Sequence, residues 1–173
     1  MVARRAFLVL GLVGGIVGGG WVYAQQRSAS RAANLSAQDY VEIQSLYAKY
    51  NQGSDFSDTA MWMSIWADDA VFKPGNQAII GTKSLAEFRA SRNAAAAKGG
   101  QRRHSNSSIL LTPTLEGASG RAYFTLLDTS AKQSVIAAAG YYDDTFVKTD
   151  KGWVFKTRIL HFDPPPAPGQ RTQ

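Results

Sequence analysis

Apolar residues recur with the period of an α-helix in the first part of the chain. A helix is predicted over Ala37–Gln52, behind a capping-box pattern that begins at Ser36. Its apolar stripe consists of Tyr40, Ile43, Tyr47 and Tyr50. A short helix is predicted over Thr59–Trp66, and a third from Ser84, where Ser-Leu-Ala-Glu repeats the capping-box pattern, to near Lys98. Three N-terminal helices are therefore expected.

Beyond these helices the apolar pattern changes to a period of two, which is typical of β-strands. The expected strands are Arg102–Leu115, Arg121–Asp128, Ser134–Lys148 and Trp153–Phe162, with turns at residues 117–120 and 150–152. A shorter extended segment is expected over Asp69–Lys73. Helices followed by a strand meander predict an α+β fold, in which the three helices pack in a curved, mainly antiparallel sheet.

Residues 1–24 have the features of an export signal. A basic start precedes an apolar, glycine-rich run, and Val22-Tyr23-Ala24 offers small residues at the cleavage positions. Arg4-Arg5 followed by Phe7-Leu8 also fits a twin-arginine signal. We expect an exported, periplasmic or secreted protein without stable membrane insertion after cleavage; an uncleaved membrane anchor is the alternative. A flexible lead-in (25–35) and a Pro-rich, disordered tail (164–173) would flank a domain at 36–163.

The composition narrows the possible chemistry. The chain contains no cysteine and two histidines, which excludes disulfides, thiolate nucleophiles and a three-histidine metal centre. We therefore expect no metal site. The formal net charge of +6 comes from scattered Lys and Arg residues rather than from a basic stripe, so nucleic acid is not an expected partner. Eight Phe, four Trp and seven Tyr supply a substantial core.

Five segments occur in an order that resembles a known family. They are "LYAKYNQGSD", "IWADDAVF", "GTKSLAEF", "RRHSNSSI" and "GYYDDTFVKTDKGWVF". In this order they resemble the SnoaL-like branch of the nuclear-transport-factor-2-like superfamily, over roughly Leu35–Asp163; scytalone dehydratase and ketosteroid isomerase are relatives. The resemblance implies a cone-shaped fold around an apolar pocket, without a metal or organic cofactor. The same fold hosts dehydratases, isomerases, cyclases and non-catalytic binders.

His104 is the first candidate catalytic residue. Strand alternation places His104 and Asn106 on one face, together with Ser108 and Leu110. The resemblance puts His104 where scytalone dehydratase carries a pocket-facing catalytic histidine, and an imidazole can exchange protons near neutral pH. Asn106 would then line the substrate site. The alternative is a strand histidine that only hydrogen-bonds to a neighbour.

The end of the first helix offers phenols and an amide. Tyr47 and Tyr50 lie three residues apart and share one side of the helix, where their hydroxyls could stabilise a substrate oxygen or simply belong to the core. The resemblance favours Tyr50. The family acid beside it is replaced by Asn51, which can orient a group but cannot take a proton. Asp55 could substitute for that acid, or could be a surface acid that ends the helix.

The last two strands add further candidates. Parity places His161 on the inward row of Trp153, Phe155, Thr157 and Ile159, near the pocket mouth, although it could instead bond a loop carbonyl. Tyr142 and Asp144 share a face with Ala138 and Gly140, where Asp144 could pair with His104 or Arg158, or lie outside at an oligomer interface.

The resemblance is incomplete at two positions. Lys73-Pro74 stands where ketosteroid isomerases keep their base, and the second dehydratase histidine falls near Ala139. Neither mechanism can therefore be carried over whole.

Two hypotheses follow. The first is a cofactor-independent lyase or isomerase acting on a small aromatic or polyketide-like molecule, with His104 as base, Tyr50 and Asn51 stabilising oxygen, and His161 or Asp144 assisting. Trp62 and Trp66 would offer a stacking surface, or else belong to the core. The second is a non-catalytic binding or self-assembling protein. In both, exposed apolar residues on the outer sheet face, Tyr123 and Leu127, predict a homodimer or homotrimer.

Overall fold

The structure, a computed structural model, describes residues 34–164. The predicted signal peptide (1–24), nearly all of the lead-in and nearly all of the tail lie outside these residues. Within residues 34–164, no helix is long and apolar enough to cross a membrane.

The described part of the chain contains three helices, labelled α2 (Ala37–Asp55), α3 (Thr59–Met63) and α4 (Gly81–Ala96). The capping box at the start of α2 is present: the Ser36 hydroxyl accepts from the Asp39 N–H, and the Asp39 carboxylate accepts from the Ser36 N–H. The helix continues three residues beyond its predicted end at Gln52. Gly53 does not break it, because this glycine packs directly against the backbone of Trp62.

The second helix is shorter than predicted. It ends at Met63, and Trp66 already begins strand β1 (Trp66–Lys73), so the predicted helix over Thr59–Trp66 is wrong at its C-terminal end. The physical reason is competition from the sheet. The Phe155 N–H donates to the Ile65 carbonyl at 2.8 Å, and Trp66 pairs with Phe155, so strand hydrogen bonds replace helical ones there.

The start of α4 also differs from the prediction. Ser84 does not cap it: the helix begins at Gly81, after strand β2 (Ile79–Ile80), and no side chain caps its N-terminus. Pairing of β2 with β1 fixes this entry. Glu87, the expected capping acid, instead forms an ion pair with Lys83 on the helix surface. The predicted capping box at Ser84 is therefore wrong.

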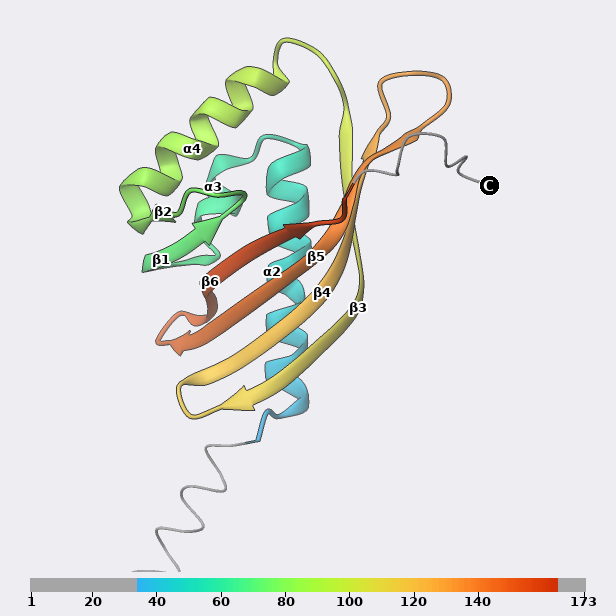
Figure 1. The fold of residues 1–173 in the computed structure, drawn as a ribbon. Helices are drawn as coiled ribbons and strands as arrows, with labels where there is room; N and C mark the ends of the chain where they lie inside the picture. Colours follow the sequence, from blue (N-terminus) through green and yellow to red (C-terminus); the bar gives the residue numbers. More distant parts are fainter. Residues whose placement is uncertain (1–33, 165–173) are drawn as a thin grey trace, which may run out of the picture. The chain divides into compact units, whose positions relative to one another are not determined.

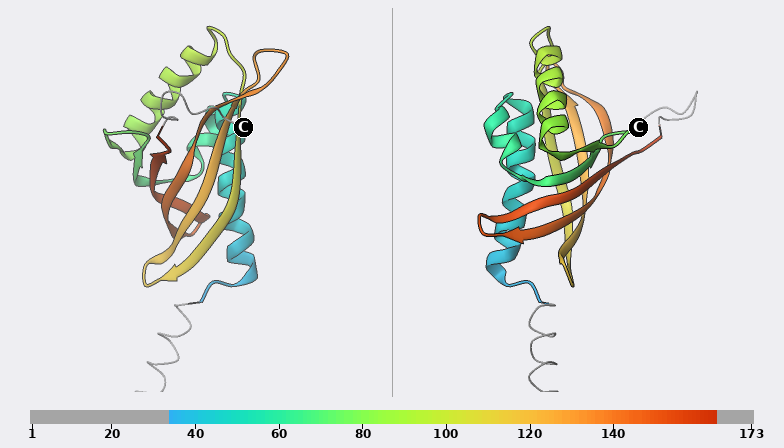
Figure 2. Two further views of the ribbon diagram at one scale, coloured as in Figure 1. Left: turned by 45° about the vertical axis from the view of Figure 1, so that its right-hand side comes forward. Right: turned by 90° about the vertical axis from the view of Figure 1, so that its left-hand side faces the viewer.

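Six strands of the described chain form one sheet in the order β2-β1-β6-β5-β4-β3. The later strands are β3 (Arg102–Thr114), β4 (Gly117–Asp128), β5 (Val135–Thr149) and β6 (Gly152–Phe162). All neighbours pair antiparallel except β1 with β6, which run parallel. The predicted turn at 117–120 is wrong, because Gly117 already pairs with Thr114. Figures 1 and 2 show the sheet curving around α2 and α4, which confirms the α+β class.

Bulges in β3 and β6 change which face the later residues of these two strands present. In β3, the register shifts between Ser107 and Leu110 and Ser108 has a positive φ of 51°. Leu111 is therefore buried and Leu110 is 67% exposed, so the predicted inward positions of Ser108 and Leu110 are wrong. The second bulge lies in β6, where Phe155 and Thr157 pair with the adjacent residues Phe146 and Thr145 of β5.

The bulge in β6 reverses its alternation. Phe155 is buried in the core, and after the bulge it is Arg158 and Leu160 that face inward. His161 therefore points outward, and the predicted inward row is wrong for Thr157, Ile159 and His161.

Candidate active site

A cavity of about 1270 Å³ opens between the end of α2, helix α4 and the inner face of the sheet. Its apolar wall is formed by Tyr50, Trp62, Phe72, Phe124, Tyr142 and Leu160. Phe124 and Tyr142 stack on neighbouring strands with ring centroids 4.8 Å apart, and Tyr50 packs edge-on against Phe72. Such a wall suits a flat, aromatic molecule.

His104 and Asp55 form a closely bonded pair on this cavity. The Nδ1 atom of His104 lies 2.5 Å from Oδ1 of Asp55, and the His104 N–H donates to Oδ2 at 3.0 Å. The Asp55 side chain is only 5% exposed. The two contacts with the Asp55 carboxylate fix the orientation of the His104 ring. Because the carboxylate accepts a hydrogen bond from Nδ1–H, it favours the tautomer in which Nε2 carries no hydrogen and can accept a proton.

Tyr50 borders the same pair. Its ring lies edge-on to the His104 ring, with centroids 6.0 Å apart, and it is part of the cavity wall. Burial is the main cause that raises the pKa of Tyr50, and the nearby cations Arg158 and Arg89 oppose that rise without cancelling it. The phenol therefore stays protonated at neutral and mildly alkaline pH, as a hydrogen-bond donor to ligand oxygen requires.

Asn51 and Asn106 are bonded to each other rather than to the cavity. Asn51 Nδ2 donates to Asn106 Oδ1 at 2.7 Å, and Asn106 Nδ2 donates to the Tyr123 carbonyl at 3.3 Å. Neither side chain borders the cavity. The amide that replaces the family acid therefore links α2 to β3.

Asp144 lies in the sealed core, where it forms two hydrogen bonds of 2.9 Å with Arg158. The Arg158 guanidinium is also surrounded by aromatic rings, with Tyr142 and Phe155 at 4.0 and 4.1 Å from their centroids. Burial opposes the charge of Arg158, but Asp144 outweighs it and raises the pKa of the arginine. Of the two pairings considered from sequence, the structure contains the one with Arg158, away from His104.

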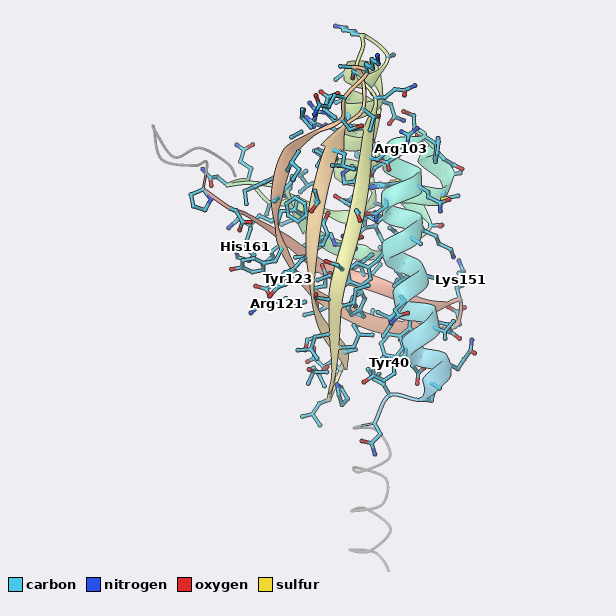
Figure 3. The ribbon with its side chains drawn as sticks, turned by 90° about the vertical axis from the view of Figure 1, so that its right-hand side faces the viewer. Tyr40, Arg103, Arg121, Tyr123, Lys151 and His161 are labelled. Atoms are coloured by element: carbon cyan, nitrogen blue, oxygen red, sulfur yellow. The ribbon has the colours of Figure 1, made fainter. Side chains whose placement is uncertain are left out.

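His161 lies on the outer face of the sheet, opposite the cavity. It stacks on Tyr141 at 4.5 Å and its Nε2 lies 3.1 Å from the Asp143 carboxylate. Figure 3 shows it with Arg121 and Tyr123 on the side of the sheet away from α2. The expectation that His161 faces the pocket mouth is therefore wrong, because the β6 bulge turns it outward.

The remaining candidates divide between the cavity and the core. Trp62 and Tyr142 border the cavity, whereas Tyr47 and Trp66 are buried behind it. Several cavity residues, among them Phe124 and Arg89, were not singled out as functional from the sequence. Phe124 could have been found from the inward parity of β4. Arg89 follows no motif, and only the contact of α4 with Trp62 reveals its position.

Comparison with known proteins identifies the family. A model of the SnoaL-like domain matches residues 36–159. The chain belongs to the SnoaL-like family. No curated protein matches the chain significantly.

Solved structures share the fold of this SnoaL-like protein. A protein of unknown function from Mycobacterium tuberculosis is 23% identical, with a TM-score of 0.67 over 79% of this chain and 84% of its own. An NTF2-like protein with a cystatin-like fold from Novosphingobium aromaticivorans is 19% identical, with a TM-score of 0.66 over 88% and 95%. A protein from Catenulispora acidiphila, solved in complex with S-DNPA, is 19% identical, with a TM-score of 0.63 over 73% and 95%.

Proposed function

We propose that this SnoaL-like protein is a cofactor-independent lyase or isomerase that acts on a small aromatic or polyketide-like molecule. The observation that carries the proposal is the His104–Asp55 pair beside the protonated phenol of Tyr50, where all three residues border the cavity next to its aromatic wall. A buried carboxylate behind an imidazole and a neutral hydroxyl beside it provide one base and one donor.

In the proposed reaction, Nε2 of His104 removes a proton from a carbon or hydroxyl of the ligand, and Asp55 stabilises the imidazolium that forms. The Tyr50 hydroxyl donates to the oxygen on which negative charge develops. In a dehydration, the electrons of the broken C–H bond form the double bond while the C–O bond breaks. The departing hydroxide takes a proton from the His104 imidazolium and leaves as water, which returns the imidazole to its neutral form. In a formaldehyde loss, an O–H proton is removed, the C–C bond breaks, and the remaining carbon is protonated.

The aromatic substrate class is supported by the cavity wall, on which Tyr50, Phe124 and Tyr142 present ring faces and edges. One fold neighbour was solved with the ligand S-DNPA, so a cone of this shape can hold a small molecule.

The reaction is tested with aromatic alcohols that carry a hydroxyl one carbon away from an acidic C–H. Proton NMR in D2O follows loss of water, release of formaldehyde and exchange of the C–H. The expected result is turnover or exchange by the wild type and its loss in His104→Ala. His161→Ala, which removes the chain's other histidine from the outer face, is the matched control and should behave as the wild type. If the wild-type protein catalyses neither loss of water, nor release of formaldehyde, nor exchange of the C–H, the result would count against the proposed enzymatic function.

A second candidate, a binding protein, is favoured by one observation. Asn51, Asn106 and Asp144 are all committed to partners outside the cavity, so none of these three candidates lies on the described cavity wall to assist the His104–Asp55 pair in proton transfer. Tight aromatic binding that His104→Ala leaves unchanged, without turnover, would favour this role.

We also propose that the protein is exported after cleavage near Gln25 and that it assembles as a homodimer or homotrimer through the outer sheet face. N-terminal sequencing of protein from the source cell should find a start at or near Gln25. A start at Met1 or Val2 on cytoplasmic protein would reject export.

A further inference from the structure

The cavity carries an excess of positive charge. Four arginines border it, namely Arg89, Arg92, Arg102 and Arg103, whereas its carboxylates are Asp55 and Asp128. Both acids are already engaged: Asp55 holds His104, and Asp128 accepts from the Ser130 N–H at 2.9 Å. The site described above uses none of the arginines.

Arg89 is the most deeply placed of the four. It is 6% exposed, and its guanidinium lies 5.7 Å from the centroid of Trp62. Nε donates to Asn93 Oδ1 at 2.7 Å and Nη1 to Ser54 Oγ at 3.2 Å, both neutral acceptors. Within residues 34–164 no carboxylate lies within ion-pair distance of Arg89, and Nη2 has no hydrogen-bond partner there.

A buried cation without an acid is costly for the folded protein. Burial is the main cause that lowers the pKa of Arg89, as expected for a guanidinium without an ion-pair partner. Since Asn93 and Ser54 accept from Nε and Nη1, the guanidinium is held in place, and Arg89, which borders the cavity, keeps Nη2 as a further donor. The Ser54 hydroxyl, which accepts from Arg89, keeps its own hydrogen for a second bond.

We propose that Arg89 binds the carboxylate of the ligand, and that the substrate class is therefore an aromatic acid whose ring lies on the apolar wall. This inference rests on the proposed function, because it assigns the substrate class of the same cavity. Nη2 of Arg89 and the Ser54 hydroxyl supply two donors to the carboxylate. Arg92 and Arg103 at the cavity border raise the local concentration of anions.

The test measures equilibrium binding, which does not depend on turnover. The probes are 4-hydroxybenzoate and 4-hydroxycinnamate, each compared with its primary amide, which has nearly the same shape without the charge. Isothermal titration should show that the wild type binds at least one acid about 10- to 100-fold more tightly than its amide, the range of a hydrogen-bonded charge pair. Equal affinities for acids and amides, or no binding of either acid, would overturn the proposal.

Variants separate this role from a structural one. Arg89→Gln should bind acid and amide equally, and its melting temperature reports whether the links to Ser54 and Asn93 were needed for folding. Arg121→Gln removes an arginine from the outer face and should keep the preference for acids. An Arg89→Gln protein that folds and keeps the preference would contradict the assignment. His104→Ala should retain it, so failure of the catalytic mechanism and failure of anion recognition give different results.

Discussion

Asp39 ties the start of α2 to two strands. Its carboxylate accepts from the Ser36 N–H at 2.9 Å, from Lys148 Nζ at 2.7 Å and from Trp153 Nε1 at 2.8 Å. The bond from Lys148 is the largest cause that lowers the pKa of Asp39, followed by the bond from Trp153. One side chain therefore links the helix N-terminus to β5 and β6.

This linkage makes stability depend on pH. The folded-state pKa of Asp39 lies below its unfolded value of about 3.9. The stabilisation that Asp39 gives the folded protein is therefore complete above the unfolded pKa and is lost as pH falls through the folded pKa. Asp39→Asn should lower the free energy of unfolding by about 1 kcal/mol or more at pH 7. Urea unfolding should show the gap from wild type narrowing below about pH 4. A gap independent of pH would contradict this role.

Asp55 shows which residues sequence reasoning could reach. The Gly53-Ser54-Asp55 run reads as a helix stop. Sequence reasoning therefore left two alternatives for Asp55, a surface acid that ends the helix and a substitute for the family acid. In the structure α2 continues through Gly53, and Asp55 lies one turn beyond Asn51, where it meets His104. The packing that extends the helix is a tertiary contact, which local propensity does not contain.

At the scale of elements, the helices and four long strands could be predicted because each has a sustained period. What could not be predicted was the face of each residue beyond a bulge. Alternation was correct for His104 and Asn106 before the β3 bulge and wrong for Leu110 after it. His161 was misplaced for the same reason in β6. The extra residue of a bulge cannot be recognised from the hydropathy pattern, yet it moves every later side chain of the strand to the opposite face of the sheet.

The contact between α2 and α3 gives a prediction about Gly53. A Cβ built there would lie 2.9 Å from both the backbone N and Cβ of Trp62, so the helices would have to separate. Gly53→Ala should lower the free energy of unfolding by about 1–3 kcal/mol, although alanine has a higher helix propensity than glycine. Gly75→Ala, where nothing lies within 4 Å, is the control and should change stability by less than about 0.5 kcal/mol. Similar urea midpoints for the two variants would refute this packing argument.

At the scale of the whole molecule, the family order of five segments predicted the α+β cone, and the sheet of the described residues confirms the class. The parallel pairing of β1 with β6 and the short strand β2 were not predicted. Both depend on contacts between segments far apart in the sequence. The buried Asp144–Arg158 pair was one of two open pairings, because strand parity gives a face but not a partner.

The outer sheet face carries the assembly prediction. Tyr123 is 56% exposed there, near the Arg121–Asp143 ion pair and His161. Apolar surface of this kind favours contact with a second copy. Light scattering should give a dimer or trimer mass at micromolar concentration, and Tyr123→Glu should reduce it to the monomer. A wild-type monomer under those conditions would count against assembly.

The most direct test of the central claim is kcat/KM for wild type, Asp55→Asn, His104→Ala and the double variant, on a substrate found by the NMR screen. His104→Ala should lose about 10²–10⁴-fold, because it removes the general base. Asp55→Asn should lose less, and the double variant should lose no more than His104→Ala, since the carboxylate acts through the imidazole. A His104→Ala protein that retains most of its kcat/KM, or losses that simply multiply in the double variant, would contradict the His104–Asp55 site.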